Sequence, residues 1–222
     1  MDTPSGKVEP RTAVAVFSNA PVPGAAKTRL APHLGAAGAA SLQRALTRQT
    51  LATAVAADIG PVSLWCAPDR SHAFFSQCHL EFGVALHEQQ GADLGARMLD
   101  AFRILLADHA AVVLIGTDCP VFRPQHLRSA ATALAGGCQA AFCPAEDGGY
   151  VLVGLTEAEP RLFSGMPWGT GEVMDETRAR LSELGWPWRE LDTLWDVDRP
   201  EDYERMTSGG RPEWPAAGMS ME

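Results

Sequence analysis

The stretch Ala111–Pro120, AVVLIGTDCP, is where the expected fold of this chain is easiest to read. Five apolar residues run without interruption up to Gly116, which is typical of a strand buried on both faces of a parallel sheet. The run then stops at Asp118. One interpretation is a metal-binding carboxylate at the carboxyl edge of a sheet, and the other is a turn in which Asp118 caps a helix that starts near Pro124.

Strand-like and helix-like segments alternate along the chain on both sides of this stretch. Alternation of this kind favours a single-domain three-layer α/β/α sandwich with a mostly parallel, Rossmann-like central sheet. In such sheets, ligands bind where loops leave the carboxyl ends of the strands. Short apolar runs predict strands at 12–18, 61–67, 83–89, 110–116 and 138–145, and the segments between them predict helices at about 35–58, 69–78, 92–109 and 123–135.

The composition is that of one globular domain, which we expect to span residues 12–207. The net charge of −9 comes without any run of Lys or Arg, so nucleic acid is not an expected partner. The first 11 residues predict a flexible N-terminus, and the Gly- and Pro-containing segment 208–222 predicts a disordered tail.

The cysteines indicate a reducing compartment. The chain has 5 of them, scattered and without a C-x-x-C pair, which does not suggest a disulfide framework. No apolar run has the length of a membrane span, and the first residues lack the apolar core of a signal peptide. We therefore expect a cytoplasmic protein with no membrane span, while the oligomeric state stays open.

The loop that follows the first predicted strand, NAPVPGAAKTRL (19–30), contains Gly24, Lys27 and Arg29. In such a loop, backbone N–H groups can face phosphates while the cations neutralise their charge. The G-x-x-x-x-G-K-[ST] spacing of a Walker loop is missing. A plain turn with solvated Lys27 and Arg29 is therefore an equal alternative.

Two aspartates alternate in the stretch LWDVDRPEDYE (194–204). On an extended segment, Asp196 and Asp198 would point to the same side, where two carboxylates repel each other unless a cation lies between them. A helix that starts at Pro200 accounts for the acidic residues after it, but not for Asp196.

Two further stretches place glycines where the chain changes direction. In PAEDGGYVLVGL (144–155) the glycine pair indicates a tight hairpin turn or a close approach of the backbone to a ligand. In QQGADLGARM (89–98) the glycines lie at a strand-to-helix junction, where Asp93 is most simply a helix cap.

Taken in order, these stretches resemble the nucleotide-diphospho-sugar transferase superfamily, whose fold is of the GT-A type. The nearest likeness is to its branch of glycosyltransferase-like proteins related to 2-phospho-lactate guanylyltransferase. The resemblance covers about residues 13–206 and rests on FSNAPVPGAAKTRL, QQGADLGARMLDAF, IGTDCP, EDGGYVLVGL, PWGTGEVMDET and DVDRPEDYE. It implies a metal-dependent transferase that uses a nucleoside triphosphate or a nucleotide sugar together with a small-molecule acceptor.

The resemblance also implies roles for the matched positions. Catalytic roles fall on Lys27, Arg29 and Asp118, and nucleotide binding on Gly24, Lys27, Arg29, Gly91, Asp93 and Gly95. The acceptor would face Glu146, Asp147, Gly148, Gly149, Tyr150, Trp168 and Thr170, and Mg²⁺ or Mn²⁺ would be held by Asp118, Asp196 and Asp198. Nucleotidyltransferases of this fold open with a G-x-G-x-x-x-R loop, whereas prolines and a single glycine stand here, so the grip on the phosphates is expected to differ.

Two reactions fit these residues. In nucleotidyl transfer, an acceptor phosphate attacks the α-phosphorus of a triphosphate, and neutralisation by the metal and by Lys27 or Arg29 suffices without a general base. In glycosyl transfer, the metal would hold the diphosphate of a nucleotide sugar, and Asp147 or Glu146 could serve as the base. The basic first loop and the late pair of aspartates favour nucleotidyl transfer; a nucleotide-binding module without catalysis is the third alternative.

Overall fold

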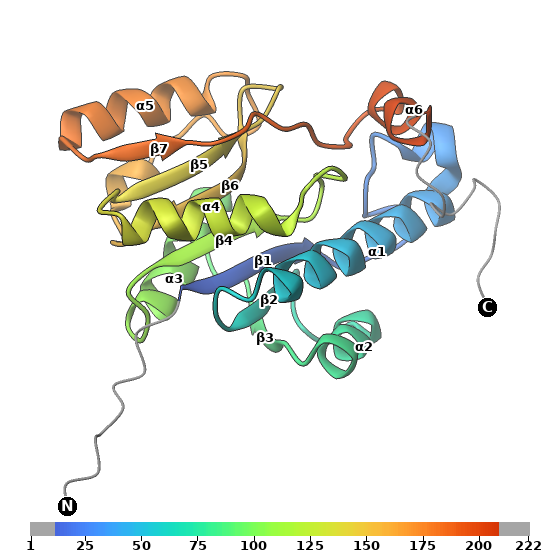
Figure 1. The fold of residues 1–222 in the computed structure, drawn as a ribbon. Helices are drawn as coiled ribbons and strands as arrows, with labels where there is room; N and C mark the ends of the chain where they lie inside the picture. Colours follow the sequence, from blue (N-terminus) through green and yellow to red (C-terminus); the bar gives the residue numbers. More distant parts are fainter. Residues whose placement is uncertain (1–11, 209–222) are drawn as a thin grey trace, which may run out of the picture.

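The structure, a computed structural model, describes residues 12–208 as one seven-stranded sheet covered by helices on both faces (Figure 1). The predicted N-terminal and C-terminal tails lie outside the described residues, except that Ser208 is the last residue of a helix. The strands are β1 (Ala13–Asn19), β2 (Val62–Ala67), β3 (Ala85–Glu88), β4 (Val112–Gly116), β5 (Ala140–Pro144), β6 (Tyr150–Leu155) and β7 (Trp188–Glu190). The helices are α1 (Ala31–Ala57), α2 (Ala73–Phe82), α3 (Leu94–Leu106), α4 (Pro124–Ala135), the short 3₁₀ helix η1 (Pro160–Leu162), α5 (Val173–Leu184) and α6 (Pro200–Ser208).

The sheet has the strand order β3-β2-β1-β4-β6-β5-β7. All neighbouring strands pair in parallel except β6, which runs antiparallel to both β4 and β5. The prediction of a mostly parallel α/β sandwich is therefore confirmed. The five predicted strands are also confirmed within a few residues, whereas β6 and β7 fall in the half of the chain for which the sequence predicts no regular pattern.

The two faces of the sheet bury separate apolar clusters. Along β1, Val14 and Val16 pack with α1, α2 and α4, while Ala15 and Phe17 pack with α3 and α5. This alternation follows from the two-residue period of a strand, and every one of these side chains is buried because both faces are covered.

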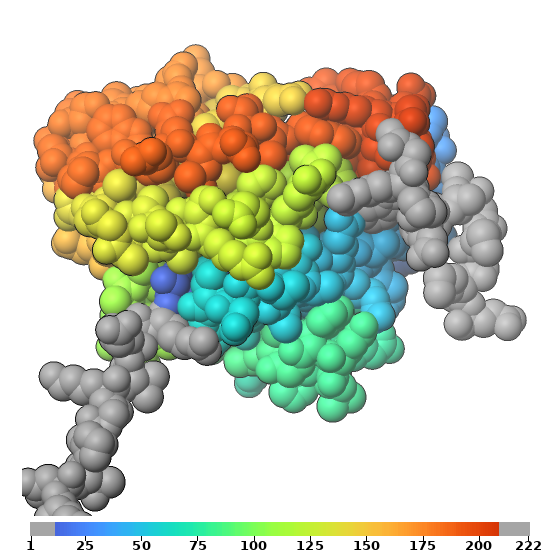
Figure 2. All heavy atoms as spheres, viewed as in Figure 1, coloured from blue at the N-terminus to red at the C-terminus, as the bar shows by residue number. Residues whose placement is uncertain are grey.

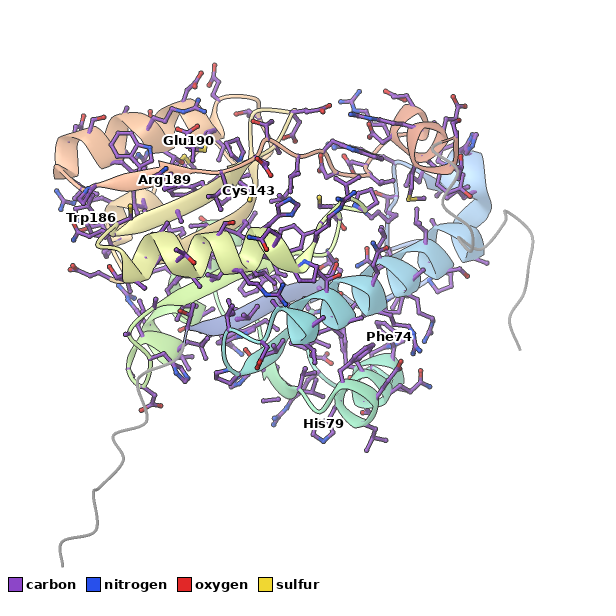
Figure 3. All side chains as sticks on the ribbon, in the orientation of Figure 1. Phe74, His79, Cys143, Trp186, Arg189 and Glu190 are labelled. Atoms are coloured by element: carbon purple, nitrogen blue, oxygen red, sulfur yellow. The ribbon has the colours of Figure 1, made fainter. Side chains whose placement is uncertain are left out.

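Two elements depart from the predicted boundaries for physical reasons. The first helix begins at Ala31 and bends at Gly35, whose φ of 71° is not helical, so the sequence pattern identifies only the part after the bend. Near the end of the chain, α5 is fastened to β7 because Arg178 donates two hydrogen bonds of 2.8 Å to Glu190 (Figure 3). Trp186, just before β7, is buried in the cluster under α5.

Three loops meet at the carboxyl edge of the sheet. The parallel pairing of Phe17 with Gly116 puts the ends of β1 and β4 side by side. The segment after β7 crosses this edge on its way to α6 (Figure 1), and the N–H of Val197 there donates to the carbonyl of Asp118 at 2.8 Å. In the space-filling view, the residues near 200 lie beside the start of α1 (Figure 2). Val197 and Tyr203 are buried in one cluster with Leu30, which precedes α1, and Leu42.

Within residues 12–208, no helix combines the length and the apolar character that crossing a bilayer requires.

Candidate active site

A buried lysine joins the three loops at the carboxyl edge. The side chain of Lys27 is 4% exposed, and its Nζ lies 2.8 Å from Oδ1 of Asp118. The same ammonium donates a hydrogen bond of 2.5 Å to the carbonyl of Val197. Because a buried cation needs a partner, Lys27 holds Asp118 and the segment around Val197 together. The Asp118 side chain is 48% exposed and so remains open to a ligand.

A network of buried polar side chains lies behind Asp118. The Gln43 amide of α1 donates to the hydroxyl of Thr117 at 3.1 Å and to that of Thr47 at 3.3 Å. Ser18, at the end of β1, lies 2.9 Å from Thr47. These bonds fix the ends of β1 and β4 on α1, which sets the position of Asp118. The sequence contains a trace of this network, since Gln43 and Thr47 stand four residues apart on an otherwise apolar helix face.

The carboxylates around Asp196 lie close enough to influence one another. Burial first, and then the nearby charges of Asp147 and Asp118, raise the pKa of Asp196 to about 6, while Lys27 acts in the opposite direction. A carboxylate of raised pKa beside two others is a favourable place for a further cation. Asp118 and Asp196 therefore fit a hard divalent cation, which takes carboxylate oxygens and keeps waters and phosphate oxygens as its other ligands.

The third predicted metal ligand is placed differently. Asp198 forms an ion pair with Arg29 at the surface of the first loop. Within the described residues, no group of three or more His, Cys, Asp or Glu side chains is arranged to hold a metal ion. A ligand set of Asp118, Asp196 and Asp198 therefore stays a prediction, and it would require Asp198 to leave Arg29.

Three adjoining cavities follow this edge of the sheet. The central cavity, about 380 Å³, is bordered by Asp118, Asp196 and the ends of β1 and β4. The inner cavity, about 200 Å³, is mainly apolar and shares Tyr150 with the central one. The outer cavity, about 280 Å³, shares Asp196 with the central cavity and Asp147 with the inner cavity. Asp196 and Asp147 thus lie on the borders between neighbouring cavities.

The predicted phosphate loop is divided between two places. Lys27 faces Asp118, whereas Arg29 borders the outer cavity, and Gly24 borders none of the three cavities. The alternative of two solvated cations is wrong for Lys27 because its side chain is almost fully buried. It holds for Arg29, which is exposed apart from its pair with Asp198.

The junction between β3 and α3 contributes other residues than those predicted. Asp93 is the N-cap of α3, since its Oδ1 accepts a hydrogen bond of 2.7 Å from the N–H of Ala96. Gly91, Asp93 and Gly95 border none of the three cavities, and the central cavity is bordered instead by Gln89, Leu94 and Arg97. The cap was the simpler of the two interpretations for Asp93, and the cap geometry bears it out.

The glycine pair forms the turn of the hairpin between β5 and β6, as the sequence indicates. At Gly148, φ is 89°, and a Cβ there would lie 2.1 Å from the carbonyl oxygen of Gly171. The carbonyl of Gly148 also accepts a hydrogen bond of 2.8 Å from Met174. The close approach made possible by Gly148 is therefore to the loop at 169–171 of the chain itself. Both segments border the outer cavity.

The two acidic residues before this turn differ in their surroundings. Glu146 accepts two hydrogen bonds from Arg205 of α6, at 2.6 and 3.0 Å, and these bonds hold its pKa below the usual value. Asp147 accepts a hydrogen bond of 2.9 Å from the N–H of Gly149 and borders both the inner and the outer cavity. Of the two, Asp147 is the better placed to meet an acceptor.

Solved structures of similar fold indicate the class of protein. A protein from Desulfovibrio desulfuricans G20, provisionally named a nucleotide-diphospho-sugar transferase, is 28% identical, with a TM-score of 0.77 over 85% of this chain and 82% of that one. CMP:2-keto-3-deoxy-manno-octonic acid synthetase, complexed with CTP, is 13% identical, with a TM-score of 0.54 over 89% and 97% of the two chains. Glucosyl-3-phosphoglycerate synthase from Mycobacterium tuberculosis, in complex with Mn²⁺, UDP and glucosyl-3-phosphoglycerate, is 11% identical, with a TM-score of 0.50 over 89% and 76%.

At such low identity the last two likenesses show the fold alone. The first, at 28% identity, places the chain in the nucleotide-diphospho-sugar transferase superfamily of enzymes, as the sequence motifs imply. The comparison with curated proteins gave no match. Residues 50–170, more than half of the chain, match the family described as "Uncharacterized protein conserved in bacteria (DUF2064)", and the chain belongs to that family.

Proposed function

We propose that the protein is a metal-dependent transferase that moves a nucleotidyl group from a nucleoside triphosphate to a small phosphorylated acceptor. The observation that carries this proposal is the pair of buried Lys27 and half-exposed Asp118 beside Asp196. This group lies where the central cavity, large enough for much of a nucleotide, adjoins two further cavities for a second substrate. Transfer between two bound molecules requires such an arrangement.

In this proposal the triphosphate lies in the central cavity, with its base and ribose near Gln89 and Arg97 and its phosphates near Asp118. Asp118 and Asp196 hold Mg²⁺ or Mn²⁺, which when bound supplies positive charge to the phosphoryl oxygens. Lys27 orients Asp118 from behind and offsets the charge of both carboxylates. These groups are fixed before the substrate arrives, so little reorganisation accompanies the reaction.

The acceptor phosphate has two cations available in the outer cavity, Arg29 and Arg199. An oxygen of that phosphate attacks the α-phosphorus, and pyrophosphate leaves. Since the attacking oxygen is already anionic, the chain needs no general base for this step. Asp198 binds Arg29 in the structure, and an acceptor phosphate would compete for that arginine.

Glycosyl transfer is the second candidate, and the position of Asp147 favours it. This carboxylate borders both acceptor-side cavities and lies close enough to Asp196 to raise its pKa. It could therefore accept the proton of an acceptor hydroxyl while the diphosphate of a nucleotide sugar leaves.

A thermal-shift comparison separates these candidates, because a ligand that binds only the native state raises the melting temperature. We expect nucleoside triphosphates to raise it in the presence of Mg²⁺ or Mn²⁺ and to lose this effect with EDTA. The variant Asp196→Asn should lose the metal-dependent shift. Asp108→Asn, which changes an exposed aspartate after α3, should keep it and serves as the matched control.

Two outcomes would contradict the proposal. A shift with nucleotide sugars alone would favour glycosyl transfer. No shift with either class of nucleotide would show that the central cavity does not bind nucleotides under these conditions, and nucleotide use would have to be abandoned.

A further inference from the structure

The inner cavity differs in chemistry from the rest of the site. Its wall consists largely of aromatic and aliphatic side chains: Phe17, Met98, Leu114, Tyr150, Val153 and Trp168. Asp147 is the one carboxylate on its border, and no Lys, Arg or His among the described residues borders it. A phosphate or carboxylate placed there would lose its hydration without gaining a cation.

The aromatic wall of this cavity is fixed by packing. The rings of Tyr150 and Trp168 meet edge to face with centroids 6.2 Å apart, and Phe142 supports Tyr150 from behind at 5.3 Å. Trp168 also lies against α3, where a Cβ on Gly95 would come within 2.7 Å of Nε1 of the indole. The glycine predicted to bind nucleotide thus makes room for this tryptophan.

The buried indole N–H of Trp168 lacks a hydrogen-bond partner among the described residues, which costs free energy. Buried indole N–H groups usually find an acceptor. The ring is therefore held by its packing against Tyr150 and α3 and not by a hydrogen bond to any described residue.

The outer cavity has a charged lining, in contrast to the apolar lining of the inner cavity. Arg29 and Arg199 border it, and it meets the inner cavity at Asp147 and Thr170. Five carboxylates border it as well, those of Glu146, Asp147, Asp196, Asp198 and Asp202. One molecule that reached both cavities would therefore find charged side chains, the two arginines among them, at one end and an apolar wall at the other.

We propose that the inner cavity binds an uncharged, apolar group of the acceptor, about the size of a six-membered carbon ring, while the charged end of the acceptor faces Arg29 and Arg199. The size follows from the volume of about 200 Å³, since a dry apolar cavity of about 150 Å³ is enough to bind benzene. That the bound group belongs to an acceptor rests on the proposed function, whereas the apolar binding site itself does not.

The test uses the full chain labelled with ¹⁵N at its tryptophans, which number six. The variant Trp168→Phe identifies the indole signal of Trp168 in the spectrum. We expect benzyl alcohol, a neutral ring probe, to shift this signal in a saturable manner at millimolar concentration. Glucose, a polar ring, and inorganic phosphate should not shift it.

Two leucines provide a matched pair of variants. Leu94 borders the inner and central cavities and is 46% exposed, whereas Leu80 of α2 is 82% exposed and borders none of the three. Leu94→Tyr enlarges a side chain at the cavity and should weaken benzyl alcohol binding about tenfold. Leu80→Tyr makes the same change elsewhere and should leave binding unchanged.

The proposal is overturned if benzyl alcohol leaves the Trp168 signal in place, if glucose or phosphate shifts it equally, or if Leu94→Tyr binds as well as Leu80→Tyr. Melting curves with a triphosphate and Mg²⁺ on the same samples test the proposed function separately from the apolar binding site. Nucleotide binding without ring binding would refute the inference and leave the proposed function standing. Ring binding without nucleotide binding would support an apolar site and refute the proposed function.

Discussion

Replacing either member of the ion pair between Lys27 and Asp118 should lower the stability of the protein, but by unequal amounts. Asp118→Asn removes the half-exposed partner and leaves the ammonium of Lys27 buried, with the carbonyl of Val197 as its remaining close partner. Breaking a buried pair in this way costs about 3–5 kcal/mol. Because Asp196 is near enough to offset part of the charge, we expect a loss at the lower end, about 3 kcal/mol.

The opposite change, Lys27→Met, leaves a carboxylate that water still reaches. We expect it to cost about 1.5 kcal/mol, the value of a hydrogen bond to a charged group. The double variant should then be more stable than the sum of the two single effects predicts, because the asparagine no longer leaves a charge unpaired. Urea unfolding followed by tryptophan fluorescence measures all four proteins under one set of conditions.

Equal losses in the two single variants, or a larger loss for Lys27→Met, would refute this reasoning. Additive effects in the double variant would do so as well, since they would mean that Lys27 and Asp118 contribute independently. Gln125→Glu, which changes charge at an exposed site on α4, controls for a general effect of net charge.

Three further results are expected. Gly148→Ala should destabilise the protein by about 3 kcal/mol or more, because its Cβ would overlap the carbonyl of Gly171, while Gly165→Ala, at a φ of 64° with open space around it, should cost about 1 kcal/mol in the same urea titration. Arg178 holds the pKa of Glu190 below its usual 4.5, so the stability that this pair contributes is present above pH 4.5 and is lost on acidification; Glu190→Gln should flatten the acid limb of a stability–pH curve, and Glu183→Gln should not. Arg205→Met removes two exposed hydrogen bonds to Glu146 and a contact of 4.3 Å with the Trp195 ring, and the melting temperature should fall only slightly because such surface pairs contribute about 1 kcal/mol or less.

The central part of the fold could be predicted because its signals are local. The unbroken apolar run of β4 and the amphipathic face of α3 each follow from one continuous stretch of sequence. The hairpin turn at Gly148 is equally local. The antiparallel placement of β6 between β4 and β5 is not local, since it depends on pairing between β4 and β6, which are distant in the sequence, and no short stretch contains that information.

For the site, the sequence predicts which types of residue gather at the sheet edge better than it predicts which atoms they contact. Asp118 and Asp147 lie close enough to Asp196 to raise its pKa, whereas Asp198, the third predicted metal ligand, pairs with Arg29. The burial of Lys27 could not be predicted because one of its acceptors, the carbonyl of Val197, lies 170 residues away and is a backbone atom that leaves no trace in the residue pattern. Gln89 and Arg97 were missed for a related reason, as the glycines beside them gave the stronger motif.

The same 170-residue separation bears on when the site can exist during synthesis. A ribosome that has made β1 through α4 has already produced Lys27 and Asp118, but not the segment around Val197 that contacts them. Contacts so distant in sequence form late, after the intervening chain is available. We therefore expect a nascent chain that ends before Asp196 to lack both the Val197 carbonyl that binds Lys27 and the Asp196 carboxylate, so that this edge of the cavities is incomplete until the last part of the chain has been made.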